Sequence, residues 1–207
     1  MIDHWGGMTN ATRTWAGTTL ADRRAIRRQQ LIDAGIELLG GGDTAAVTVR
    51  AVCRTAKLTE RYFYESFADR DALMLAVYEH VAESARQAIL NAMVDVEPRP
   101  EALARAAVTA FVELLIDDPR KGTVLLLAPI TEPALNKRGS ELLPTFTAMI
   151  HDQLPDSYDE TDRKLTATSL VGALTYLFIS YLDGSLDVPR DRMIDHAVRM
   201  LVAAASP

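Results

Sequence analysis

The sequence predicts an all-α fold, in which a small N-terminal three-helix domain precedes a larger helical domain. Apolar residues recur at spacings of three and four along most of the chain, which is the periodicity of an amphipathic helix. Alternation with a period of two, the signal of a half-buried strand, never persists. Prolines and a run of three glycines separate the periodic segments. The 207-residue chain is therefore expected to form one or two helical domains.

The N-terminal segment divides into a tail and a first helix. Residues 1–20 are rich in Thr, Gly and Ala without periodicity, so we expect a flexible tail there. From about Asp22 to Leu39 the apolar residues fall on one face, and Gly40-Gly41-Gly42 then ends the helix.

Two short helices are predicted next, over residues 48–56 and 59–65. Thr48 is suited to cap the first, because its side-chain oxygen can accept a hydrogen bond from a free N–H at the helix start. About three residues join the two helices, which is the length of a helix-turn-helix, although many helical hairpins are purely structural. Asp69 is then expected to cap a long helix that ends near Met93.

The rest of the chain is predicted to contain five further helices. Pro98 and Pro100 end the long helix, because proline disrupts a helix interior. The following helices are expected at about residues 101–116, 120–128, 138–153, 159–183 and 190–205. We divide the chain into a tail (1–20), a helix-turn-helix domain (21–70) and a helical domain (71–207).

Composition excludes some classes of protein. The chain is 48% hydrophobic and 24% charged, which is ordinary for a globular protein with a substantial core. The most apolar helical stretch, about Leu170 to Leu182, is interrupted by Gly172 and Thr175, so we expect no membrane span and a cytoplasmic location. The N-terminus lacks the basic start and apolar block of a secretory signal. The single cysteine, Cys53, rules out an internal disulfide.

The charge is distributed unevenly along the chain. The net charge of −6 at first sight argues against binding to nucleic acid, which is itself negatively charged. Residues 1–71, however, contain ten Lys or Arg and nine Asp or Glu, whereas the remainder contains twelve and nineteen. A DNA-binding module needs positive charge only where phosphates lie, so the acidic remainder is expected to face away from any duplex.

Signals of catalysis are poor. The four histidines are scattered, and Cys53 lies on the apolar stripe of a short helix, where a buried structural role is expected. The chain has neither a phosphate-binding loop nor a nucleophile elbow. We therefore predict no enzyme activity, no cofactor and no metal site.

The segment from Thr48 to Leu73, TVRAVCRTAKLTERYFYESFADRDAL, resembles the N-terminal signature of the TetR family of bacterial regulators. The similarity extends over about residues 24–80 and weakens in the helices downstream. The matching residues are Thr48, Val49, Arg50, Val52, Ala56, Leu58, Thr59, Phe63, Tyr64, Phe67 and Leu73. The resemblance implies a ligand-responsive regulator, usually a repressor, that binds DNA through the helix-turn-helix.

Three positions depart from the family pattern. Lys57 stands at the turn where the family has glycine, Cys53 replaces alanine, and Ser66 replaces an aromatic residue or histidine. A non-glycine residue in the left-handed region costs about 1 kcal/mol. The position of Lys57 therefore predicts a positive φ and a side chain suited to contact a phosphate.

The resemblance implies roles for individual residues on double-stranded DNA. Thr59, Arg61 and Tyr62 are expected to meet base edges from the second short helix, Arg61 as a bidentate donor to guanine. Phosphate contacts are expected from Thr48, Tyr64 and Arg70, and from Lys57 at the turn. Four arginines of the first helix are candidates for the adjacent backbone or minor groove, or form a solvated face: Arg23, Arg24, Arg27 and Arg28.

The resemblance also implies a homodimer and a ligand cavity. Residues 159–205 contain two helices that are apolar on more than one face, including Leu174, Phe178 and Met200, and are expected to pair with a second copy on a palindromic operator. The helices over 74–153 would enclose an apolar or amphipathic effector. Candidate lining residues are Met93, Phe111, Leu115, Leu126, Phe146 and Met149, with Glu113 or His151 as polar contacts.

Other interpretations remain open from the residues alone. A helical enzyme or ligand carrier with an incidental helical hairpin is one, and DNA binding controlled by a protein partner is another. The apolar candidates are equally consistent with an ordinary core. Repression and activation are not distinguished by the sequence.

Overall fold

The computed structural model describes residues 19–205, and every regular element within that range is helical. Eighteen residues of the expected tail, 1–18, lie outside it. Thr19 and Leu20 instead begin the first helix, α1 (Leu20–Leu39), where the Thr19 hydroxyl accepts a hydrogen bond from the Asp22 N–H. The Asp22 carboxylate accepts one from Thr19 in return, so the cap extends the helix by two residues beyond our prediction.

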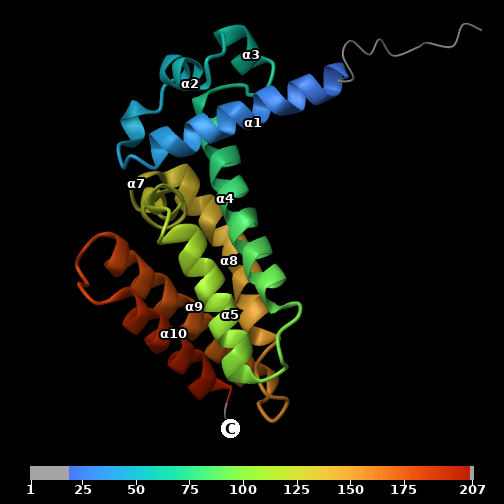
Figure 1. Ribbon diagram of the computed structural model, residues 1–207, viewed down its shortest axis with the longest axis vertical. Coiled ribbons are helices and arrows are strands. Elements are labelled where there is room, and N and C mark those ends of the chain that lie inside the picture. Colours follow the sequence, from blue (N-terminus) through green and yellow to red (C-terminus); the bar gives the residue numbers. More distant parts are fainter. Residues whose placement is uncertain (1–18, 206–207) are drawn as a thin grey trace, which may run out of the picture.

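The N-terminal domain follows the predicted order. A short 3₁₀ turn, η1 (Thr44–Ala46), leads to α2 (Val49–Ala56) and then to α3 (Glu60–Tyr64). Thr48 caps α2, and its hydroxyl accepts a bond from the Ala51 N–H. Figure 1 shows α2 and α3 above α1, at the end of the molecule farthest from the C-terminus.

One long helix joins this domain to the rest of the chain. Helix α4 (Arg70–Met93) begins where Asp69 accepts a hydrogen bond from the Ala72 N–H, as predicted. Helix α1 crosses it closely at Gly35, where a Cβ would lie 2.5 Å from a methyl carbon of Val77. The hydrophobic core is one continuous cluster that includes residues from both sides of this crossing.

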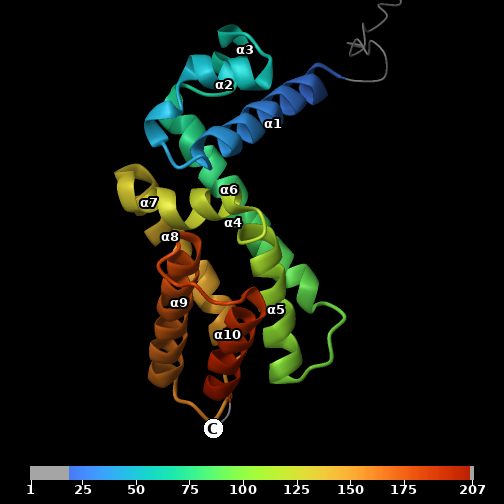
Figure 2. The same ribbon diagram turned by 60° about the vertical axis from the view of Figure 1, so that its left-hand side comes forward.

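The C-terminal helices form a bundle around the lower part of α4 (Figure 1). Their order and bounds are α5 (Pro100–Leu115), α6 (Pro119–Gly122), η2 (Thr123–Leu127), α7 (Ala128–Thr131), α8 (Pro133–His151), α9 (Glu160–Leu182) and α10 (Arg190–Ala204). Figure 2 shows α9 and α10 running side by side along one flank of this bundle.

Two boundaries in this bundle differ from the prediction. Helix α8 begins five residues earlier than expected, because Pro133 occupies its first turn, where a missing N–H costs nothing. The helix predicted over 120–128 belongs to a longer helical run that changes register. Residues Thr123–Leu127 form one π turn, closed by a bond from the Ala128 N–H to the Thr123 carbonyl, before α7 resumes.

Helix α9 is more continuously apolar than the sequence analysis predicted. By length and composition alone it is apolar enough to cross a membrane, because its most apolar stretch of 18 residues has a mean hydropathy of 1.5. Only 22% of the residues in that stretch are buried within the chain. The low burial of this helix has two sources. One side of α9 lines a cavity, and the other side carries the exposed residues Leu165 and Tyr176.

Candidate functional site

The turn between α2 and α3 has the geometry of a helix C-cap. Lys57 adopts φ 54° and ψ 39°, so the predicted left-handed conformation is present. Its N–H donates to the Arg54 carbonyl, and the Leu58 N–H donates to the Cys53 carbonyl at 2.9 Å. This bond pair fixes the angle between α2 and α3 and leaves the Lys57 side chain exposed.

The three predicted base-reading residues lie together at the start of α3 but differ in freedom. Thr59 is exposed and its hydroxyl makes no capping bond. The Arg61 side chain is 84% exposed, and its Nε lies 3.2 Å from a carboxylate oxygen of Glu65, one turn along. Tyr62 is half-buried because the guanidinium of Arg27 stacks 4.4 Å from its ring centre. Thr59 and Arg61 are therefore the more accessible of the three.

Two of the predicted phosphate contacts also lie on this surface. Tyr64 is 58% exposed, and its ring meets the buried Phe63 edge-on at 5.4 Å between ring centres. Thr48 is exposed, although its hydroxyl is already used in the α2 cap. Together with Lys57 they are exposed residues of the helix-turn-helix.

Arg70 is placed differently. Its Nε donates to the Val47 carbonyl at 2.7 Å, and one terminal nitrogen donates to the Thr44 carbonyl at 2.7 Å. The same nitrogen lies 3.5 Å from a Glu132 carboxylate oxygen, and the other contacts Asp71 at 3.0 Å. The guanidinium thus joins η1, α4 and the start of α8, which sequence spacing did not indicate.

The arginines of α1 mostly brace the domain. Arg27 stacks on Tyr62 and lies 3.6 Å from Glu65, so it holds α3 from behind. Arg28 lies 5.0 Å from the centre of the Phe67 ring. Arg23 is half-buried, and Arg24 is exposed.

Two exposed arginines on α2 were not among our candidates. The Arg50 side chain is 90% exposed and lies 3.5 Å from Glu60 on α3, and Arg54 is also exposed. Their four-residue spacing puts them on one face of α2, a signal that was readable in the sequence.

Cys53 has the structural role that was expected. Its side chain is 5% exposed within the core of the N-terminal domain. Burial raises the pKa of the thiol, and the negative charge of Glu60 raises it further. The thiol is thus kept protonated and unreactive. Among the described residues no group of three or more His, Cys, Asp or Glu could hold a metal ion.

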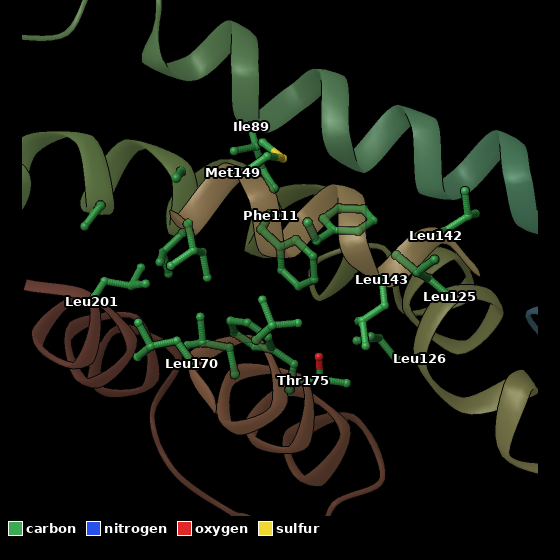
Figure 3. Close-up of a pocket in the computed structure, with 18 of the residues that line it drawn as sticks. Ile89, Phe111, Leu125, Leu126, Leu142, Leu143, Met149, Leu170, Thr175 and Leu201 are labelled. Atoms are coloured by element: carbon green, nitrogen blue, oxygen red, sulfur yellow. The ribbon is translucent and has the colours of Figure 1, made fainter. Parts of the chain in front are cut away.

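A cavity of about 700 Å³ lies within the C-terminal bundle, between α4, α5, η2, α8 and α9. Figure 3 shows Phe111, Leu126 and Leu170 projecting into the same space from three different elements. None of the lining residues, all within the described part of the chain, carries a charge. Five of the predicted lining residues are present: Met93, Phe111, Leu126, Phe146 and Met149.

Leu115 does not line the cavity and corrects that prediction. It is fully buried at the end of α5, one turn beyond Phe111. There α6 lies so close that a Cβ on Gly122 would be 2.2 Å from the Leu115 carbonyl oxygen. The close packing of α6 on the end of α5 therefore separates Leu115 from the cavity.

The predicted polar contacts are also misplaced. Glu113 is exposed on α5, and His151 lies between Asp152 and Glu160, with 3.4 Å to each carboxylate. Neither lines the cavity. The polar lining residues are instead Tyr78, Asn136, Ser140, Gln153 and Thr175.

The cavity is connected to the N-terminal domain through the π turn. Leu125 and Leu126 on η2 line the cavity, and α6 directly precedes them. The Cα of Arg120 on α6 is 2.7 Å from where a Cβ on Gly40 would lie, at the end of α1. The η2–α6 segment therefore lies between the cavity and the end of α1.

The outward face of α9 is apolar but differs from the one we predicted. Leu174 lines the cavity, and Phe178 is 4% exposed and packs on Phe111 with 4.9 Å between ring centres. Leu165 and Tyr176 are 61% and 72% exposed and lie on the opposite side. The register of α9, fixed by its packing on the bundle, decides which stripe faces outward.

Comparison with known families identifies the N-terminal domain. Residues 31–77 match the family described as "Bacterial regulatory proteins, tetR family". The matched segment contains the C-terminal part of α1, the whole of α2 and α3, and the first third of α4. No curated protein sequence matches the chain.

Solved structures share the fold over most of the chain. The fatty acid degradation regulator FadR from Bacillus halodurans has a TM-score of 0.73 at 13% identity, covering 87% of this chain and 96% of its own. A TetR family member from Streptomyces coelicolor A3 has a TM-score of 0.66 at 24% identity, covering 84% and 97%. The multidrug binding protein EbrR, complexed with imidazole, has a TM-score of 0.62 at 24% identity, covering 84% and 94%.

Proposed function

This chain belongs to the TetR family of bacterial regulatory proteins and is a transcriptional regulator of that family, and from that premise we propose that it is a ligand-responsive repressor. In this proposal a homodimer binds a palindromic operator through two copies of α3. A small apolar or amphipathic effector enters the cavity and releases the DNA. The protein acts in the cytoplasm as a binding protein without catalytic activity.

The observation that carries the DNA-binding proposal is the exposed start of α3. Thr59 and Arg61 are held outward there by a turn whose geometry Lys57 fixes, over a core sealed by Phe63. Arg61 can donate to the O6 and N7 atoms of guanine in the major groove. Lys57, Arg50 and Tyr64 flank it and are suited to the phosphates on either side.

The cavity supports control by a small molecule. Its volume and its apolar lining are those of a typical ligand pocket. Two structural relatives are described as a fatty acid degradation regulator and a multidrug binding protein. A ligand that wedges Leu125 and Leu126 apart from α9 would shift η2, and α6 would carry that shift to Gly40 and α1. A two-fold dimer makes the spacing of the two α3 helices sensitive to such a shift.

The dimer is proposed to form through residues 159–205, with the outward face of α9 at its centre. Leu165 and Tyr176 are large hydrophobic side chains that are exposed to water on the isolated chain. Pairing with the same face of a second copy removes that surface from water and explains the low burial of this apolar helix.

Fluorescence anisotropy with DNA from upstream of the protein's own gene tests this proposal. We expect sequence-preferring binding, with log affinity falling against log salt by about 0.9 per phosphate contact. Arg86→Gln is a matched control, because Arg86 lies on α4 in a pair with Glu83, remote from α3. Binding that ignores sequence, or an equal loss in Arg86→Gln and Lys57→Gln, would favour a ligand carrier with an incidental helical hairpin.

A further inference from the structure

The cavity is lined by a largely buried tyrosine whose hydroxyl is not used by the protein itself. Tyr78, on α4, is 5% exposed and lines the cavity. The hydroxyl makes no hydrogen bond to a described residue, and its oxygen is not fully buried, so a molecule in the cavity can reach it. The hydroxyl lies against α8, where a Cβ on Gly139 would be only 2.7 Å from its oxygen.

The protonation state of Tyr78 makes it a hydrogen-bond donor. Burial raises the pKa of the phenol, and the nearby positive charge of Arg138 only partly opposes this. Arg138 is itself held outside the cavity, with its Nε 2.7 Å from Glu79 and a terminal nitrogen 2.9 Å from Glu141. Its charge is compensated there and is not offered to a ligand.

Most of the other polar groups of the lining already have a hydrogen-bond partner or are exposed to water. Ser140 already donates to the Asn136 carbonyl at 3.0 Å. Asn136, Ser140 and Gln153 are all exposed, so water reaches them. Thr175 is half-buried, and Figure 3 shows its hydroxyl on the α9 side of the cavity.

The cavity is also long. Its lining on α4 runs from Tyr78 to Met93, about 22 Å along the helix axis, which is twice the diameter of about 11 Å of a sphere of 700 Å³. No charged side chain lines the cavity, so an ionised group in its buried part would have no ion-pair partner there, and burial of an unpaired charge is strongly unfavourable.

We infer that the effector is an uncharged, elongated and mainly hydrocarbon molecule whose single oxygen acceptor binds the Tyr78 hydroxyl. This inference rests on the proposed effector cavity and names the class of its ligand. The hydrocarbon part lies along the apolar lining toward Ile89 and Met93, and the oxygen end lies between α4 and α8.

Calorimetric titration of the full chain, without DNA, tests this with three probes of equal length. Decan-1-ol carries a neutral oxygen, decanoate a negative charge and decylammonium a positive charge. At neutral pH we expect decan-1-ol to bind at least about a hundredfold more tightly than either ion, because neither ion finds a partner inside. Equal or tighter binding of decanoate or decylammonium would overturn the inference.

Variants identify the hydroxyl that is used. Tyr78→Phe is expected to weaken decan-1-ol binding about three- to tenfold, the range for loss of one neutral hydrogen bond. Gly139→Ala is expected to weaken it as well, because the added methyl displaces the hydroxyl while removing no polar atom. Tyr158→Phe is the matched control, since Tyr158 lies outside the cavity lining. Unchanged affinity in Tyr78→Phe, or a loss confined to Thr175→Val, would show that Tyr78 is not the partner.

Binding and DNA release are measured separately, so that the two proposals can fail separately. If decan-1-ol binds through Tyr78 without releasing DNA, the effector mechanism proposed above is wrong and the ligand class stands. If DNA is released by a charged ligand instead, the mechanism stands and the ligand class is wrong.

Discussion

Lys57 holds the turn between α2 and α3 in a left-handed backbone conformation. Its φ of 54° costs a side chain about 1 kcal/mol, which glycine avoids. We expect Lys57→Gly to be neutral or stabilising by up to about 1 kcal/mol, since the greater entropy of unfolded glycine offsets part of the gain. Urea unfolding measures the change.

Arg54→Gly is the matched control for that substitution. Arg54 lies one turn earlier in α2, is exposed, and has ordinary helical geometry. Glycine is expected to cost about 0.5–1 kcal/mol there. If both variants lose stability equally, the turn does not depend on the left-handed conformation of residue 57.

Arg61 is expected to read a base. Arg61→Ala should cost roughly 1–3 kcal/mol per half-site and relax the preference at one base pair in each half. Tyr64→Phe removes only a hydroxyl from the flank, so it should weaken all sequences alike. Titrations on the operator and its single-base variants separate the two effects. A flatter salt dependence with unchanged preference in Arg61→Ala would assign Arg61 to the backbone instead.

Arg70 is expected to act through the protein rather than through a phosphate. Its guanidinium satisfies the carbonyls of Thr44 and Val47, so Arg70→Ala should lower the free energy of unfolding by about 1–3 kcal/mol. Arg70→Lys keeps the charge but cannot reproduce the forked bonds, so it should lose much of the same stability. If Arg70→Lys restores both stability and DNA affinity, the charge alone is needed and the phosphate prediction stands.

An ion pair between the loop after α5 and the start of α10 makes a pH-dependent contribution to stability. Arg190 donates two hydrogen bonds to Asp117, at 2.8 and 2.6 Å. These bonds hold the pKa of the Asp117 carboxyl below its usual range. A lowered pKa in the folded state stabilises the fold above about pH 4, and this contribution is lost as the pH falls through the folded-state value.

Asp117→Asn is therefore expected to lower the melting temperature at pH 7, and this difference should shrink as the pH falls below about 4. The effect should stay below about 1 kcal/mol, because both side chains are more than a third exposed. Asp187→Asn is the control, since Asp187 is exposed and has no ion pair with a described residue. A difference that persists unchanged at pH 3 would mean that the carboxylate charge is irrelevant.

Assembly of two chains is expected to depend on the outward face of α9. Tyr176→Asp and Leu165→Asp should each convert the dimer to a monomer in sedimentation, because they bury a charge at the proposed interface. Val94→Asp is the control, because Val94 is 71% exposed at the end of α4 and away from α9. A dimer that survives both α9 substitutions would place the interface elsewhere.

The residue Leu174, by contrast, is a poor probe of assembly. Although periodicity placed it on an apolar stripe of α9, the bundle turns it into the cavity. An aspartate there is expected to disturb ligand binding and folding rather than pairing of chains. Only the exposed stripe separates the two effects.

Local features of the chain are enough to predict most of its helices and its helix-turn-helix. Capping residues such as Thr48 and Asp69, the glycine run and the apolar periodicity act within a few residues of themselves, so the sequence displays them directly. The positive φ at Lys57 followed from the same local reasoning together with the family resemblance.

Long-range packing decided the rest. Nothing near Arg70 in the sequence shows that it reaches carbonyls more than twenty residues away. Leu115 and Phe111 share a helix face, yet α6 seals one while the other meets the cavity. The Tyr78 hydroxyl lies at the cavity where α4 closely approaches α8 at Gly139, which no local pattern in the sequence shows. Periodicity states that a helix has an apolar face, but the contacts between helices determine what that face meets.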